Sequence, residues 1–177
     1  MTITLVLGGA RSGKSALAES LAEKTDKNLL YIATATADDE AMGKRIQTHQ
    51  AQRSDRWQLQ EEPLYLAKIL QQYDKPNSCL LIDCLTLWLT NLLMHSDKDL
   101  PEIELNKLNA ILPTLKADII MVSNEVGLGI IPMGDLTRQF CDEAGRLHQA
   151  IAKLSDNVVF TIAGLPQYLK GSPAKLG

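Results

Sequence analysis

The chain has 177 residues, of which 45% are hydrophobic and 22% charged, and its formal net charge at pH 7 is −3. These values are typical of a soluble globular protein and do not predict a surface for nucleic acid or an anionic membrane. No uncharged apolar stretch reaches the roughly 18 residues that a membrane-spanning helix needs, and no signal peptide is expected.

Strands and helices alternate along the chain, since short apolar runs predict strands and apolar residues three and four apart predict helices. In chain order we expect a strand at 2–7, a helix at 14–24, a strand at 29–33, a helix from 38 or 39 to about 53, a strand at 57–60 and a helix at 64–74. Then follow a strand at 79–83, helices at 85–94 and about 102–115, a strand at 118–123, a helix at about 135–154 and a last strand at 157–163. The tail from residue 170 on is expected to be loosely ordered.

This alternation predicts an α/β fold, a mainly parallel sheet with helices on both faces, and the length predicts a single domain over residues 1–177. Ligands of such sheets bind beside the carboxyl ends of the strands. The residues at those ends are Gly8, Thr34, Asp83 and Asn124. The chain has three cysteines, and their spacing is not that of metal ligands. This predicts reduced thiols in a cytoplasmic protein.

The segment after the first strand reads Gly8-Gly9-Ala10-Arg11-Ser12-Gly13-Lys14-Ser15 and fits the pattern G-x-x-x-x-G-K-[ST] in full. Glycines let the backbone curl so that N–H groups point at phosphate oxygens, and the next helix adds its positive N-terminus. Lys14 supplies a charge for the β- and γ-phosphates, and Ser15 offers a hydroxyl to Mg²⁺. The motif therefore predicts a nucleoside triphosphate site; the alternative is a glycine-rich turn without a ligand.

Polar residues follow two other strands. Asp83 ends an apolar run, where a second carboxylate could hold Mg²⁺ or simply cap the next helix. The segment Ser123-Asn124-Glu125-Val126-Gly127 follows another buried strand, so its polar side chains either point into the ligand crevice or satisfy a turn.

His49 lies late on the helix expected over 39–53, one turn from Arg45 and one turn from Arg53. Its place on an apolar stripe favours a structural role. Beside a bound triphosphate, however, a neutral imidazole can attack phosphorus, and the arginines can receive the developing charge. The other histidines, His95 and His148, are expected on the surface or on a helix face.

Several segments together resemble one family. They are Gly-Gly-Ala-Arg-Ser-Gly-Lys-Ser at 8–15, Tyr-Ile-Ala-Thr at 31–34, Arg-Ile-Gln-Thr-His at 45–49, Thr-Asn-Leu-Leu at 90–93, Asn-Glu-Val-Gly-Leu-Gly-Ile-Ile-Pro at 124–132 and Ala-Gly-Arg-Leu-His-Gln at 144–149. In order and spacing the chain resembles the bifunctional adenosylcobinamide kinase / adenosylcobinamide-phosphate guanylyltransferases of cobalamin biosynthesis, from residue 3 to about 165.

The resemblance implies a P-loop NTPase of the RecA-like branch that works in two steps. ATP or GTP first phosphorylates adenosylcobinamide. GTP then guanylylates a histidine, pyrophosphate leaves, and GMP passes to adenosylcobinamide phosphate to give adenosylcobinamide-GDP. The resemblance also implies Mg²⁺ as cofactor and a homotrimer.

Carried over by motif, the guanylylated histidine matches His49, which with Lys14 would be catalytic. The nucleotide contacts match the loop from Gly8 to Ser15 together with Ile32, Ala33, Thr34, Arg53, Glu61 and Asp83, and the metal ligands match Ser15 and Asp83. One alternative is a simple P-loop small-molecule kinase in which His49 is structural and no covalent nucleotide forms. Another is a regulatory module that binds GTP and hydrolyses it slowly.

Overall fold

The computed structural model describes residues 1–35, 56–130 and 132–172. Its strands are β1 (Ile3–Gly8), β2 (Asn28–Ala33), β3 (Trp57–Glu61), β4 (Ser78–Asp83), β5 (Asp118–Asn124), β6 (Asn157–Ile162) and β7 (Leu165–Lys170). Its helices are α1 (Lys14–Glu23), α3 (Leu66–Tyr73), α4 (Leu85–Met94), α5 (Leu100–Ile111) and α6 (Asp135–Leu154), with a 3₁₀ turn at Leu112–Thr114. Within these residues, no helix has the length and apolar character needed to cross a membrane.

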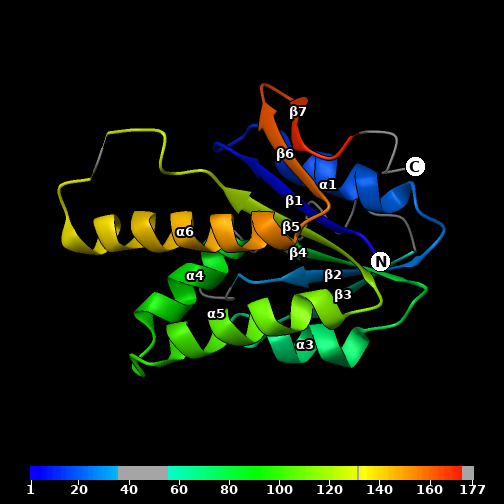
Figure 1. Ribbon diagram of the computed structural model, residues 1–177, viewed down its shortest axis with the longest axis horizontal. Helices are drawn as coiled ribbons and strands as arrows, with labels where there is room; N and C mark the ends of the chain where they lie inside the picture. Colours follow the sequence, from blue (N-terminus) through cyan, green and yellow to red (C-terminus); the bar gives the residue numbers. More distant parts are fainter. Residues whose placement is uncertain (36–55, 131, 173–177) are drawn as a thin grey trace.

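The strands form one sheet in the order β3-β2-β4-β5-β1-β6-β7. Every neighbouring pair is parallel except β6 and β7, which are antiparallel. The α1 helix covers one face, and α3, α4, α5 and α6 cover the other (Figure 1). The predicted mainly parallel sheet with helices on both faces is therefore confirmed.

The core consists of two apolar layers because successive side chains of a strand point to opposite faces of the sheet. Leu5 of β1 belongs to the layer under the four helices, with Trp88 of α4 as its largest buried member. The next residue, Val6, belongs to the layer under α1, together with Leu21 of that helix. Burial on both faces explains the nearly continuous apolar runs of the central strands.

The C-terminal end differs from expectation. The strand expected at 157–163 is not the last one, because the chain turns at Ala163 and Gly164 and returns as β7. Both turn residues have positive φ, 52° and 80°, as a tight two-residue hairpin requires. The β7 strand escaped prediction because it is an exposed edge with a proline and no apolar run.

The other boundaries agree closely with the pattern. The helix expected at about 102–115 ends at Ile111 and is followed by the 3₁₀ turn that contains Pro113. Proline disrupts the interior of an α-helix, because it has no backbone N–H to donate and its ring clashes with the preceding turn. The helix expected from 38 or 39 to about 53 lies outside the described residues.

All three cysteines are free, and burial raises the pKa of the Cys79 thiol to about 12.

Candidate active site

The glycine-rich loop joins the end of β1 to the start of α1, at the carboxyl edge of the sheet (Figure 1). Gly13 precedes the helix with φ 93°, a conformation that glycine adopts at little cost. The Ser12 N–H donates to the Gly9 carbonyl at 3.3 Å, which curls the loop, and the Leu17 N–H begins the helical pattern on the Gly13 carbonyl at 3.0 Å. The loop thus has the curled form and the helix start that phosphate binding requires.

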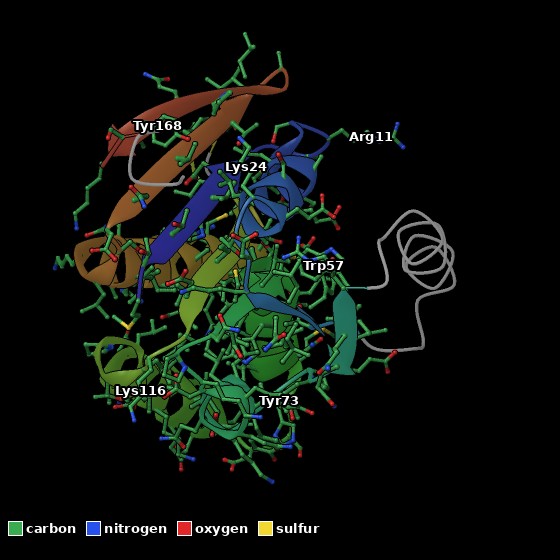
Figure 2. All side chains as sticks on the ribbon, turned by 90° about the vertical axis from the view of Figure 1, so that its right-hand side faces the viewer. Arg11, Lys24, Trp57, Tyr73, Lys116 and Tyr168 are labelled. Carbon is green, nitrogen blue, oxygen red and sulfur yellow. The ribbon has the colours of Figure 1, made fainter. Side chains whose placement is uncertain are left out.

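The β6–β7 hairpin supports the loop from behind. The Gly164 N–H donates to the Ser12 carbonyl at 2.9 Å, and a Cβ on Gly13 would lie 3.1 Å from Gly164 Cα. Two buried hydroxyls, those of Ser12 and Thr161, have no hydrogen-bond partner in the described part of the chain. Arg11, by contrast, extends away from the loop into solvent (Figure 2).

We expect Gly8→Ala to lower the stability of the protein, because the new Cβ would lie 2.5 Å from Ser12 Oγ and 2.6 Å from the Thr161 carbonyl oxygen. Overpacking of this kind costs about 1–3 kcal/mol of unfolding free energy. The matched control is Gly9→Ala, whose Cβ would meet no atom within 4 Å. Urea unfolding of both variants checks this: an equal loss of stability in the two would contradict the geometry.

The Lys14 ammonium is directed back over the loop. Its Nζ donates to the Gly9 carbonyl oxygen at 3.0 Å, and the side chain is half-buried. Ser15 follows it on the first turn of α1 and is half-buried as well. The positive charge and the hydroxyl are therefore both held beside the amides of the loop.

Asp83 ends β4, which β5 separates from the loop strand β1. The Tyr31 hydroxyl donates to Asp83 Oδ2 at 2.9 Å, and Trp57 supports the Tyr31 ring edge-on with 6.1 Å between ring centroids. One carboxylate oxygen is thereby oriented by a buried phenol. The donor set formed by this carboxylate and the Ser15 hydroxyl consists of hard oxygens, which suit Mg²⁺.

No group of three or more His, Cys, Asp or Glu side chains capable of holding a metal occurs among the described residues. A cation between Ser15 and Asp83 would accordingly take its other ligands from water and from nucleotide phosphates, as Mg²⁺ commonly does.

The predicted contacts at the end of β2 are buried in the fold. Ile32, Ala33 and Thr34 are 0%, 2% and 0% exposed. The Thr34 hydroxyl donates to the Cys84 carbonyl at 2.7 Å and accepts from the Cys84 N–H at 2.8 Å. The Thr34 side chain therefore joins the end of β2 to the segment after Asp83.

Glu61 lies apart from the loop. It is exposed at the end of edge strand β3, in register with Ala33. Because neighbouring strands are about 4.8 Å apart, four strand spacings put it roughly 19 Å from Gly8 across the sheet. The predicted residues His49 and Arg53 lie outside the described residues.

The segment from Ser123 to Gly127 was expected to point into the ligand crevice or to satisfy a turn, but its contact with His148 was not predicted. His148, expected on the surface or a helix face, is 7% exposed, because the α6 stripe that carries Leu147 and Ile151 packs against the sheet. Its Nε2 lies 2.7 Å from Ser123 Oγ, and its Nδ1 lies 3.5 Å from Glu125 Oε2. The spacing of apolar residues on α6 was the available signal, since His148 falls within that stripe.

Burial lowers the pKa of His148, against the opposing pull of the Glu125 carboxylate. In the unfolded chain the same imidazole titrates near 6.5. As the pH falls below 6.5, the unfolded chain binds a proton on this imidazole before the folded chain does. The stability that the neutral, buried imidazole contributes above pH 6.5 is therefore lost as the pH falls toward the pKa of the folded state.

We therefore expect the unfolding free energy of the wild type to fall between about pH 7.5 and about pH 5.5 by more than that of His148→Gln. Urea unfolding at the two pH values measures the difference. An identical pH dependence in the two proteins would show that His148 does not contribute.

Comparison with known proteins gives one family. A family model described as cobinamide kinase / cobinamide phosphate guanyltransferase matches residues 4–169. The bifunctional adenosylcobalamin biosynthesis protein CobP of Pseudomonas aeruginosa is 53% identical over 169 residues, covering 96% of this chain and 98% of the relative. The CobU proteins of Escherichia coli K12 and Salmonella typhimurium LT2 are each 36% identical, covering 94% of this chain and 98% of the relative.

Solved structures share the fold at low sequence identity. A structure from Pyrococcus horikoshii OT3 aligns with a TM-score of 0.55 and 7% identity, covering 99% of this chain and 89% of that one. The RadB recombinase aligns with a TM-score of 0.50 and 13% identity, covering 90% of this chain and 73% of that one. These likenesses show that the chain shares its fold with the RadB recombinase and the Pyrococcus structure.

Proposed function

The chain belongs to the cobinamide kinase / cobinamide phosphate guanyltransferase family, and on that premise we propose that it carries out two successive transfers. In the first, ATP or GTP phosphorylates the hydroxyl of adenosylcobinamide. In the second, GMP passes from GTP through a covalent GMP-histidine to adenosylcobinamide phosphate, which gives adenosylcobinamide-GDP and pyrophosphate. The observation that carries the proposal is the curled phosphate loop of β1 and α1 within a chain that matches the family almost from end to end.

For the first transfer, the loop amides and Lys14 bind the triphosphate and bring its γ-phosphorus in line with the substrate hydroxyl. The bond between that phosphorus and the β-bridging oxygen breaks, a new bond to the hydroxyl oxygen forms, and the hydroxyl proton is released. Such transfers are loose, so positioning and charge neutralisation supply most of the catalysis. Lys14 lies over the loop, where that neutralisation is needed.

For the second transfer, a neutral His49 nitrogen attacks the α-phosphorus of GTP. A P–N bond forms, the bond to the bridging oxygen breaks, and pyrophosphate leaves. A phosphate oxygen of adenosylcobinamide phosphate then attacks the same phosphorus, and the P–N bond breaks to free the imidazole. A nucleophilic histidine thereby divides one difficult displacement into two easier ones.

Mg²⁺, when bound, would neutralise charge on the phosphates and on departing pyrophosphate. Ser15 and Asp83 would hold it, with Tyr31 fixing the orientation of the carboxylate. We assign the proposed phosphate contacts to the loop and Asp83. Glu61, roughly 19 Å from Gly8 across the sheet, is proposed to contact the nucleotide at its end away from the phosphates, and Arg53 is proposed as a further nucleotide contact. Ile32, Ala33 and Thr34 would contribute through the backbone, because their side chains are buried.

We further propose one catalytic domain over residues 1–177, located in the cytoplasm and assembled as a homotrimer. Exposed apolar side chains support the assembly: Leu128, Ile130 and Met133 are 80%, 98% and 95% exposed in a single stretch before α6. Large apolar side chains gathered in this way usually mark an interaction site.

Light scattering on the purified protein should therefore give three times the 19.5 kDa of one chain. Replacing Leu128 and Ile130 with aspartate should shift the mass toward one chain, because burying the new charges between subunits would be costly. A fully active monomer would contradict the proposed assembly.

The experiment that tests the function uses the purified protein, Mg²⁺ and GTP labelled at the α-phosphorus, without a corrinoid. We expect label on the denatured chain that is stable in base and labile in acid, as a phosphoramidate is. Adding adenosylcobinamide phosphate to the labelled protein should move the label into adenosylcobinamide-GDP. A folded protein that binds GTP but carries no label would favour the simple kinase instead.

A further inference from the structure

A chain of polar contacts leads from α6 to the first residue of the phosphate loop. His148 Nε2 meets Ser123 Oγ at 2.7 Å, and His148 Nδ1 lies 3.5 Å from Glu125 Oε2. The Glu125 backbone N–H donates to the Gly8 carbonyl oxygen at 3.0 Å. The end of β5, which pairs Asn124 with Gly8 in the sheet, is therefore tied both to α6 and to the loop.

The chemistry of the groups fixes which atom carries the proton in each of these contacts. The Glu125 carboxylate only accepts, so His148 Nδ1 carries the proton that faces it. The imidazole is neutral at pH 7, since burial lowers the pKa of His148. In a neutral imidazole the second nitrogen accepts, so the Ser123 hydroxyl donates to Nε2.

The same strand end is also held from α4. Thr86 Oγ1 accepts from the Asn124 N–H at 2.7 Å and lies 3.3 Å from Ser123 Oγ. Glu125 Oε1 accepts from the Gly127 N–H at 2.6 Å, which turns the chain away from the sheet. Polar groups at the end of β5 thus have hydrogen-bond partners on both α4 and α6. The partner on α6 is the buried imidazole of His148, which accepts from the Ser123 hydroxyl.

We propose that His148 is a positioning residue of the nucleotide site, which acts through Ser123 and Glu125 to hold the end of β5 against Gly8. The loop begins at Gly8, so a shift of that carbonyl moves every amide that follows. Small misplacements at a ligand site weaken binding even when the fold survives. The inference rests on the proposed function only in taking GTP as the ligand of the loop.

Four full-length variants test it. His148→Leu and Ser123→Ala each remove one member of the pair, whereas His148→Gln keeps an acceptor for the Ser123 hydroxyl. His95→Leu is the matched control, because His95 lies at the end of α4 and accepts from the Asp97 N–H. The probe is the α,β-methylene analogue of GTP with Mg²⁺, which binds without transferring GMP, and calorimetry gives its Kd.

We expect His148→Leu and Ser123→Ala to raise the Kd about tenfold, as loss of a supporting residue behind a ligand site commonly does. His148→Gln and His95→Leu should stay near the wild-type value. Nitrogen-15 spectra of the wild-type imidazole should show a proton on Nδ1 of His148 and none on Nε2, a signature that Ser123→Ala changes.

A folded His148→Leu protein with the wild-type Kd would overturn the inference, and so would a proton on Nε2 in the wild type. If His148→Leu does not fold, the Kd of Ser123→Ala and the nitrogen-15 spectrum of the wild type test the inference instead. Failure of the wild-type protein to bind the analogue would count against the proposed function, whereas wild-type binding that no variant alters would count against the inference alone.

Discussion

A His49→Ala protein incubated with Mg²⁺ and α-labelled GTP should carry no label, and its formation of adenosylcobinamide-GDP should fall by roughly 10³-fold or more. Alanine leaves no nucleophile at this position, so the two-step displacement has no route. Phosphorylation of adenosylcobinamide should stay within about twofold of the wild-type rate, because the γ-phosphate is transferred without that imidazole. Thin-layer separation measures the two activities in parallel reactions, with GTP labelled at the γ-phosphorus for phosphorylation and at the α-phosphorus for GMP transfer.

The matched control is His95→Ala, which removes an imidazole at the end of α4, where its Nδ1 accepts from the Asp97 N–H. That variant should label fully. Undiminished label on the His49→Ala protein would show that another residue forms the covalent bond to GMP. Loss of phosphorylation along with the label would mean that His49 serves the fold or nucleotide binding instead.

Lys14→Ala should lower kcat for both transfers by about 10²–10³-fold, since one preorganised positive group that stabilises transition-state charge is commonly worth that much. The Nζ of Lys14 lies 3.0 Å from the Gly9 carbonyl oxygen, so its charge faces the loop. Unfolding free energy should change by less than about 1 kcal/mol, because the hydrogen bond of Lys14 is exposed to solvent and substitutions at exposed sites usually change stability little. Steady-state kinetics of the two reactions, paired with urea unfolding, separate the two effects.

Lys24→Ala is the control for charge. It removes a lysine that follows the last turn of the same helix, about 15 Å along the axis. Figure 2 shows Lys24 on the α1 side of the molecule, away from Arg11 of the loop. Equal losses in Lys14→Ala and Lys24→Ala would indicate a general effect of net charge.

The phosphate loop could be predicted from the sequence because its geometry is encoded locally. A strand, a glycine at positive φ and a helix N-terminus follow one another within a few residues, so their order along the chain is already their order in space. Asp83 was predictable for a similar reason, since an apolar run that ends in a carboxylate places that carboxylate at a strand end.

The cluster around His148 could not be predicted in this way, because its partners come from distant parts of the chain. Burial of the imidazole depends on how α6 docks, and its contact with Ser123 spans 25 residues. The place of His148 in the apolar stripe of α6 signals burial, but the stripe does not show which distant residues the imidazole contacts. The β7 strand was missed for a different reason: it pairs with its neighbour in the chain, β6, but lacks the apolar pattern of a buried strand.

The position of β1 inside the sheet has a consequence for synthesis on the ribosome. The strand is made among the first residues, yet its two neighbours are β5 and β6, at 118–124 and 157–162. At about 5–20 residues per second, β1 waits roughly ten to thirty seconds for its second partner. The β2 and β4 strands can pair long before that. The strand that leads into the triphosphate site would therefore gain its second neighbour only after most of the chain has been made, and a shorter unfinished chain would contain the motif without this support.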